Sequence, residues 1–128
     1  MVFPQNKLDS STTKQVGDVA EDAALHHLQA RGLRLLERNY RTPGRGGGEI
    51  DLIMCAPDGT TVFVEVRQRR SASHGGAAAS VSTTKQRRII FAARHYLMRL
   101  REPPPCRFDV VSVEPSGILW LQAAFEAF

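Results

Sequence analysis

The sequence predicts an α/β domain in which a mixed central sheet is flanked by helices, in the order α-β-β-β-α-β. Apolar residues recur with the period of a helix in two segments, at about 13–30 and 82–101. The segments between and after them alternate in the manner of strands, and such an order packs helices against a sheet. The length of 128 residues fits one domain. We place that domain at 15–128, behind a frayed polar tail at 1–14.

The first helix, at about 13–30, is predicted from Ala20, Ala24 and Leu28, which share one face, and from Gly32 as a stop. The second helix, 82–101, precedes three prolines that would end it. Residues 118–121 are compatible with one more strand, and 122–128 with a short helix. The other expected elements are strands at 33–41, 48–56, 60–69 and 106–113 and flexible loops at 42–48 and 71–80.

Positive charge is concentrated in one part of the chain, whose overall net charge is +4. The stretch from Glu65 to Arg107 holds ten Lys or Arg residues and two acids, so it carries +8 and the remainder carries −4. A basic half on a small domain is typical of polyanion binding, and the planar guanidinium of arginine suits phosphate. We therefore expect nucleic acid, with DNA as the first choice, as the partner. The alternative is a solvated basic surface without a specific partner.

The location expected from the sequence is the cytoplasm. No apolar run reaches the roughly 18 residues that a membrane helix needs, so no membrane partner is expected. Cys55 and Cys106 lie in apolar segments, where they are expected as buried thiols in a reducing compartment and not as a disulfide.

The two central strands form a hairpin whose register follows from its turn. If 57–59, Pro-Asp-Gly, is a three-residue loop, Asp51 lies opposite Glu65, with Cβ atoms roughly 5 Å apart. A two-residue turn would set Asp51 against Val66 and mix core and charge on both faces. One face carries Glu49, Asp51 and Ile53 with Phe63, Glu65 and Arg67. The other, expected in the core, carries Ile50, Leu52 and Met54 with Val62, Val64 and Val66.

Facing carboxylates at Asp51 and Glu65 suggest a metal site, because they would repel unless a cation lay between them. Oxygen ligands suit Mg²⁺ or Mn²⁺, which can polarise a phosphodiester and activate water. Glu21 would enter the same cleft if the first helix packs over the hairpin. The alternatives are two solvated acids on an exposed sheet, Glu49 and Glu65 paired with Arg67, and an ordinary surface acid at position 21.

Several motifs, in order, resemble those of the YraN-like family of uncharacterised bacterial proteins. They are Gly17-x-x-x-Glu21-x-x-Ala24, Arg38-Asn39-Tyr40-Arg41, Gly48-Glu49-Ile50-Asp51-Leu52-Ile53, Phe63-Val64-Glu65-Val66-Arg67, Lys85 and Arg107-Phe108-Asp109-Val110-Val111. The resemblance covers about residues 17–113. That family is similar to Holliday-junction resolvases and other PD-(D/E)xK nucleases, so the resemblance implies a restriction-endonuclease-like core.

The resemblance also implies a site made of a helix acid, a strand Asp and an acid-x-Lys on the next strand. Carried over to this chain, the catalytic residues are Glu21, Asp51, Glu65 and Arg67, and the first three are the metal ligands. Arg67 departs from the usual Lys, and because arginine keeps its proton at neutral pH it cannot act as a general base. It can still hold a scissile phosphate. Lys85, on the following helix, could supply an ammonium if its side chain reaches the site.

Three functional hypotheses follow. The first is a Mg²⁺- or Mn²⁺-dependent endonuclease acting on structured or branched DNA. The second is a non-catalytic DNA-binding module on a nuclease scaffold, and the third is a repair or replication adaptor. A homodimer is compatible with the resemblance, since resolvase-like folds often pair to meet two strands. The expected nucleic-acid contacts flank the site in sequence and are Arg69, Arg70, Lys85, Arg87 and Arg88.

Overall fold

The computed structural model describes residues 13–70 and 81–127, with side chains from Gly17 onward. The predicted α/β class and element order are confirmed, and the further strand considered at 118–121 is present as part of the last element. Nearly all of the expected tail and the whole of the 71–80 loop lie outside the described residues. The elements are α2 (Thr13–Ala30), β1 (Arg34–Arg41), β2 (Glu49–Cys55), β3 (Thr61–Gln68), α4 (Thr83–Leu97), β4 (Cys106–Glu114) and β5 (Gly117–Phe125).

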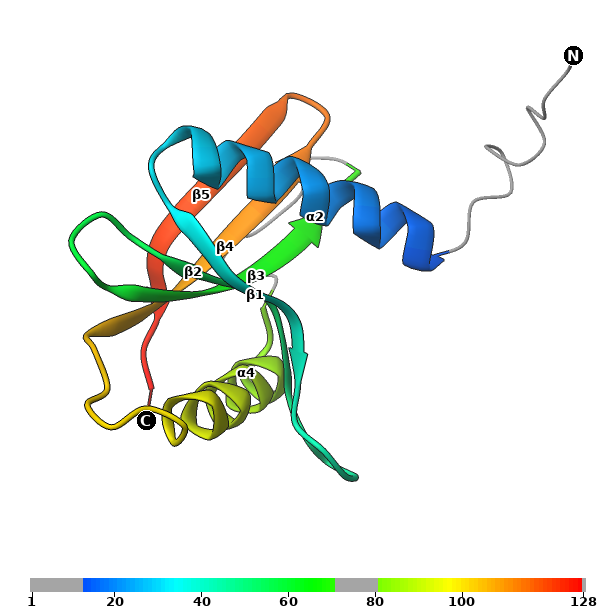
Figure 1. Ribbon diagram of the computed structural model, residues 1–128. Coiled ribbons are helices and arrows are strands. Elements are labelled where there is room, and N and C mark those ends of the chain that lie inside the picture. The colour runs from blue at the N-terminus through cyan, green and yellow to red at the C-terminus, as the bar shows by residue number, and fades with distance from the viewer. Residues whose placement is uncertain (1–12, 71–80, 128) are drawn as a thin grey trace, which may run out of the picture.

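The fold has three layers, with α2 on one face of a five-stranded sheet and α4 on the other (Figure 1). The strand order is β1-β2-β3-β4-β5, and β3 and β4 are parallel while the other neighbours are antiparallel. The sheet is therefore mixed, as predicted. The α2-side core includes Ala24, Leu28, Leu52, Met54, Val62, Val64 and Val111. The α4-side core includes Ile53, Phe63, Ile89, Ala93, Tyr96 and Phe108.

The β2–β3 hairpin has the register that the turn predicts. Ile53 pairs with Phe63, and the Ala56 N–H donates to the Thr60 carbonyl at 2.8 Å. Gly59 takes a φ of +90°, the left-handed conformation that a three-residue turn requires of its glycine. The three-residue turn is therefore confirmed, and the register it sets places Asp51 opposite Glu65.

Regular pairing is interrupted at Asp51, which belongs to no pair of either neighbouring ladder: the β2–β3 pairs end at Leu52, and the β1–β2 pairs skip Asp51 and resume at Ile50. Asn39, which the β1–β2 register places opposite Asp51, has a φ of +54°, a conformation that asparagine tolerates better than most residues. The alternation of faces breaks at this point. Ile50 packs in the α4-side core although Leu52 packs on the α2 side. The prediction that Ile50 and Leu52 share a face was wrong, because alternation assumes an uninterrupted strand.

The predicted start of α4 agrees with the structure, whereas the predicted end of α4 and the predicted end of the chain do not. Ser82 caps α4, but the helix stops at Leu97, before the prolines that were expected to end it. The short helix expected at 122–128 was wrong, since β5 continues to Phe125 through a bulge at which Ala123 has a φ of +50°. Both cysteines are free, but the prediction that they are buried was wrong, since Cys55 is half-buried and Cys106 is exposed. Among the described residues, no helix combines the length and the apolar character needed to cross a membrane.

Candidate functional site

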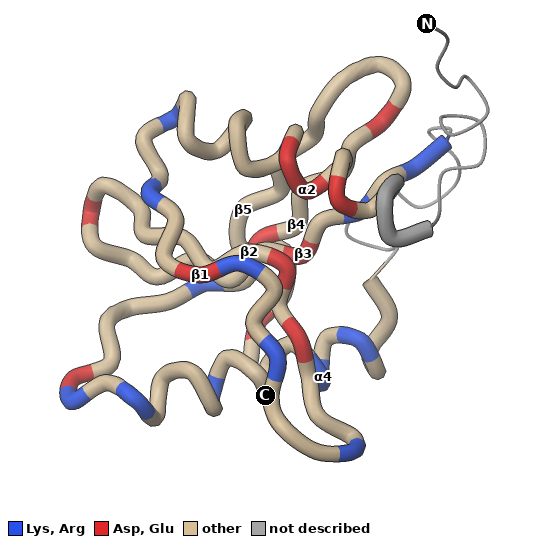
Figure 2. The backbone as a smooth tube through the Cα atoms, turned by 45° about the vertical axis from the view of Figure 1, so that its right-hand side comes forward, with Lys and Arg blue, Asp and Glu red and all other residues tan. Residues whose placement is uncertain are grey.

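An open cleft of about 450 Å³ lies beyond the point where β2 and β3 stop pairing. It takes residues from α2, both strands and the first turn of α4, so both helices border it. In Figure 2 the acidic positions of α2, β2 and β3 lie close together, with basic positions of α4 and the 42–48 loop below them. The lining residues are Gly17, Ala20, Glu21, Glu49, Asp51, Glu65, Val66, Arg67, Gln68 and Lys85. All four predicted catalytic residues are among them.

Asp51 and Glu65 form the acidic centre of the cleft. Glu65 is only 3% exposed, and the Val66 N–H donates to Asp51 Oδ2 at 2.7 Å. Burial and the adjacent negative charge of Glu65 raise the pKa of Asp51 to about 7, against the opposing effects of the Val66 N–H and the Lys85 ammonium. At neutral pH about half of the Asp51 carboxyl groups therefore hold a proton that an ordinary aspartate would release, and a bound cation could replace that proton.

Two basic side chains from different elements contact the Glu65 carboxylate. The Lys85 Nζ is 3.0 Å from Glu65 Oε2, and the Arg67 Nη1 is 3.8 Å from the same oxygen. Lys85 lies in the first turn of α4, where its backbone N–H donates to the capping Ser82 Oγ at 3.1 Å. The cap therefore starts the helix where Lys85 can reach across to β3. The side chain of Lys85 does reach the predicted site.

Glu21 faces the same cleft from α2, since that helix packs over the hairpin as the prediction required. Its side chain is 13% exposed, and its Oε1 lies 3.4 Å from the Nε of Arg38, whose Nη2 also contacts Asp22 at 2.6 Å. Burial and the charge of Asp51 raise the pKa of Glu21, while Arg38 opposes the rise. Glu21 is therefore close enough to Asp51 for their charges to interact, but its carboxylate is bound to Arg38.

The acids of the cleft offer a metal ion two oxygen-bearing side chains at once. Within residues 17–70 and 81–127, no group of three or more His, Cys, Asp or Glu side chains could hold an ion as they stand. Mg²⁺ commonly takes one or two carboxylates and completes its shell with water and substrate phosphate. Asp51 and Glu65 fit that requirement. Glu21 would join as a third ligand only after leaving Arg38.

The predicted nucleic-acid contacts do not all lie at the cleft. Arg87 and Arg88 are exposed on α4, and Arg88 lines a small depression together with Lys85 and Glu49. Arg70 is exposed just beyond β3. The side chain of Arg69, in contrast, is 11% exposed and lies 3.6 Å from Glu114 on β4. The structure thus places Arg69 against the sheet and the other four at the surface.

Arg38 and Asn39 have no role in the sequence-based prediction, although both belong to a motif quoted for the family resemblance. Arg38 binds Glu21, and Asn39 lies in the conformation that interrupts β1 opposite Asp51. The strand β1 carries four charged residues, and nothing in the sequence singles out Arg38 among them. Nothing in the sequence indicates that Asn39 takes a positive φ in the middle of a strand.

Comparison with known proteins agrees with the sequence motifs. The family model of the uncharacterised protein family UPF0102 matches residues 20–113, a range that contains Glu21, Asp51, Glu65, Arg67 and Lys85. A UPF0102 protein of Albidiferax ferrireducens is 79% identical over 127 residues, which cover 99% of each chain. One of Paracidovorax citrulli is 63% identical over 124 residues, covering 97% of this chain and 92% of the relative. The YraN-like resemblance is thereby confirmed, and the chain belongs to the uncharacterised protein family UPF0102.

Proposed function

We propose that this protein is a metal-dependent phosphodiesterase that cleaves nucleic acid internally, with structured or branched DNA as its substrate. The observation that carries the proposal is the proximity of the Asp51 and Glu65 carboxyl groups in an open cleft, beside the Lys85 ammonium. Two carboxylates held together, one with its pKa raised to about 7, are typical of functional sites and costly in an ordinary core. The three-layer fold is compatible with the nuclease superfamily that the motifs resemble.

Asp51 and Glu65 would hold the Mg²⁺ or Mn²⁺, with Glu21 as the third candidate ligand. When bound, such an ion supplies a Lewis acid for the phosphodiester and a water of lowered pKa. Asp51 must first give up its proton, so metal affinity rises with pH up to about its pKa of 7. The cleft is open beside the two carboxylates, so a phosphate could reach an ion held there.

Lys85 takes the place of the lysine that is missing from position 67. The Lys85 Nζ contacts the same Glu65 oxygen as the guanidinium of Arg67, which belongs to β3. The cleft therefore contains both a lysine and an arginine. A lysine ammonium can donate a hydrogen bond to a reacting phosphate and can also exchange its proton, whereas arginine can only donate. We assign proton handling near the reacting phosphate to Lys85 and phosphate binding to Arg67.

The surroundings of the cleft support nucleic acid as the substrate. Arg70, Arg87 and Arg88 are exposed, and the chain carries a net charge of +4. A cytoplasmic location fits this partner and the two free thiols, Cys55 and Cys106.

The proposal is tested by titrating Mn²⁺ into the wild type, Asp51→Asn and the control Glu102→Gln by calorimetry. Glu102 is an exposed acid beyond the far end of α4. Each protein is then incubated with a labelled four-way DNA junction and a matched duplex. We expect metal uptake and junction cleavage by the wild type and the control, and neither by Asp51→Asn. Junction binding without metal uptake or cleavage would contradict the proposal and leave a non-catalytic DNA-binding module.

The division of roles between Lys85 and Arg67 is tested by exchanging the two side chains. Lys85→Gln is expected to lower kcat by about 10²-fold with Lys85→Arg no better, because only lysine exchanges its proton. Arg67→Gln is expected to raise KM instead, and Arg67→Lys to restore it. Recovery of kcat in Lys85→Arg would show that position 85 needs only a positive charge.

A further inference from the structure

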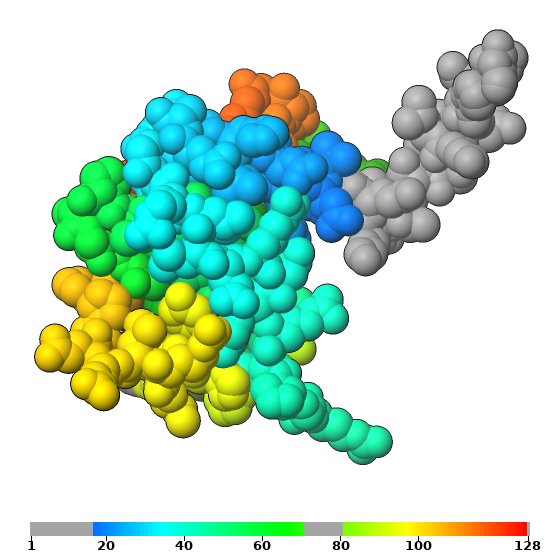
Figure 3. Space-filling view, in the orientation of Figure 1, coloured from blue at the N-terminus to red at the C-terminus, as the bar shows by residue number. Residues whose placement is uncertain are grey.

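The β1–β2 loop, residues 42–48, forms a narrow arm that projects from the body of the protein (Figure 3). Its sequence, TPGRGGG, contains no Leu, Ile, Val, Met or aromatic residue. The arm therefore has no large apolar side chain with which to join the core or an apolar protein surface. Its groups available for binding are peptide N–H and C=O groups and the guanidinium of Arg45.

The base of the arm is fixed to α4. The Thr42 N–H donates to the Gly48 carbonyl at 3.0 Å, and the Gly48 N–H donates to Thr42 Oγ1 at 2.8 Å. A Cβ on Gly48 would lie 1.8 Å from the Arg88 carbonyl oxygen, so only glycine permits this approach of the two backbones. The direction of the arm is thus set by direct backbone contact with the helix that carries Lys85.

A hollow of about 280 Å³ lies between the arm and α4. Arg41 lies 3.2 Å from Glu49, but both side chains are well exposed, so this pair holds Arg41 weakly. Neither Arg88 in the hollow nor Arg45 on the arm has an acidic partner within the described part of the chain. Guanidinium groups beside glycine backbone are a composition that binds phosphate. The lining residues are Arg41, Thr42, Gly44, Gly46, Gly47, Gly48, Glu49 and Arg88.

The hollow lies next to the acidic cleft. Glu49 lines both, and the depression between them is lined by Glu49, Lys85, Arg88 and Ile89. A polyanionic strand that placed one phosphate at Asp51 and Glu65 would therefore pass the arm with a neighbouring phosphate. A single small anion would have no reason to occupy both places.

We propose that Arg41, Arg88 and the 42–48 arm form a second phosphate-binding site, which holds the nucleic-acid backbone beside the scissile phosphate while Arg45 contacts the next phosphate along. This inference rests on the proposed function, because the ligand of the second site is taken to be the same nucleic acid. The site positions the strand in the cleft and makes binding depend on substrate that extends past the scissile phosphate. Arg41, Arg45 and Arg88 are positioning residues and act on binding, not on the chemical step.

The test uses the full chain and fluorescence anisotropy with a labelled four-way junction, in EDTA so that no cleavage occurs. Arg88→Gln and Arg45→Gln are compared with Arg101→Gln, an exposed arginine that follows the C-terminal end of α4. Each of these two variants, called the arm variants below, is expected to weaken binding several-fold. Each is also expected to reduce the slope of log K against log salt by about 0.9 per lost phosphate contact. Arg101→Gln is expected to leave the slope unchanged, and thermal unfolding confirms that the variants remain folded.

The outcomes separate this inference from the proposed function. Wild-type binding and salt slope in both arm variants would overturn the second site, even if Asp51→Asn abolishes cleavage. Selective loss of binding in the arm variants would support it, even if no divalent ion produces cleavage. Inorganic phosphate or a mononucleotide competing as strongly as an oligonucleotide of equal phosphate concentration would also overturn it, because the hollow would then be a small-anion site.

Discussion

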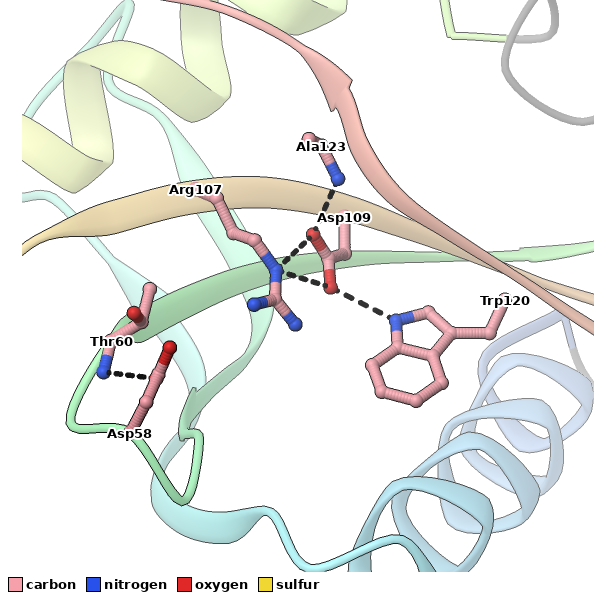
Figure 4. A network of polar contacts seen from close by, with 6 residues as sticks. All are labelled: Asp58, Thr60, Arg107, Asp109, Trp120 and Ala123. Carbon is pink, nitrogen blue, oxygen red and sulfur yellow. Dashed lines mark hydrogen bonds and ion pairs between the residues drawn. The ribbon is translucent and has the colours of Figure 1, made fainter.

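Two aspartates in the sheet of this protein, the buried Asp109 and the half-buried Asp51, have opposite surroundings. Asp109, which is fully buried on β4, accepts hydrogen bonds from Arg107 Nε at 3.0 and 3.2 Å, from Trp120 Nε1 at 2.9 Å and from the Ala123 N–H at 2.9 Å (Figure 4). Asp51 accepts one backbone N–H, at 2.7 Å, and lies beside a second carboxylate. The two aspartates therefore differ in burial, and they also differ in the number and charge of their neighbours.

The difference separates an acid that stabilises the fold from one whose surroundings favour the binding of a cation. The donors around Asp109 come from β4 and β5, so this carboxylate ties the edge strand to the sheet at its bulge. The cost of burying it is offset by charge-assisted hydrogen bonds. The Asp51 carboxyl keeps an unfavourable neighbour, which weakens the apo fold. A ligand cation would remove that penalty, and this supports the proposed function.

Replacing Asp109 with alanine is expected to cause the largest change, a loss of about 3–5 kcal/mol in the free energy of unfolding. The reason is that the Arg107 guanidinium and the Trp120 N–H would lose their buried acceptor. Urea denaturation followed by circular dichroism measures this loss. A loss below about 1 kcal/mol would mean that water replaces the carboxylate easily and that the network is not structural.

Asp51→Asn is expected to have the reverse profile, with cleavage reduced by about 10²–10³-fold and stability unchanged or slightly higher. The asparagine amide keeps an oxygen that can accept from the Val66 N–H, and the substitution removes one of the two adjacent carboxylates. Single-turnover cleavage and urea denaturation of the same preparation give both values. A strong loss of stability would place Asp51 in the same class as Asp109.

The stability of the metal-free protein is expected to fall as pH rises from about 4 to about 7, because of Asp51. Its folded pKa, about 7, lies above its ordinary value of 3.8, so within this window the folded state binds a proton that the unfolded state has lost. The slope is at most about 1.4 kcal/mol per pH unit. The difference in unfolding free energy between wild type and Asp51→Asn, followed against pH, isolates this effect from that of other acids. A pH-independent difference would contradict the raised pKa.

Trp120→Phe is expected to cause the smallest change, a loss of about 1.5 kcal/mol in unfolding free energy. The phenyl ring retains much of the apolar contact, so the variant chiefly deletes the N–H that donates to Asp109. Circular dichroism must report unfolding, because Trp120 is the only tryptophan. If Asp109→Ala is already present, the additional loss should nearly vanish, since the two residues act through one hydrogen bond.

The hairpin shows how far sequence reasoning reaches toward the site. A Pro-Asp-Gly turn and the alternation around it predicted the pairing of Ile53 with Phe63 and the facing of Asp51 and Glu65. The same reasoning put Ile50 on the wrong face, because the irregularity at Asn39 and Asp51 involves two strands at once. It also left open whether Lys85 reaches Glu65, which depends on where α4 docks.

By itself the sequence determined the helices, the central strands and the residues of the acidic pair, because period, turn chemistry and glycine conformation act over a few neighbours. Only the tertiary structure decided which charges meet. It formed the ion pairs of Lys85 with Glu65, of Arg38 with Glu21 and of Arg69 with Glu114. It also drew the last residues into β5 through pairing with β4 and the contact of Ala123 with Asp109. These outcomes rest on contacts between residues far apart in the chain, whose energies no local pattern contains.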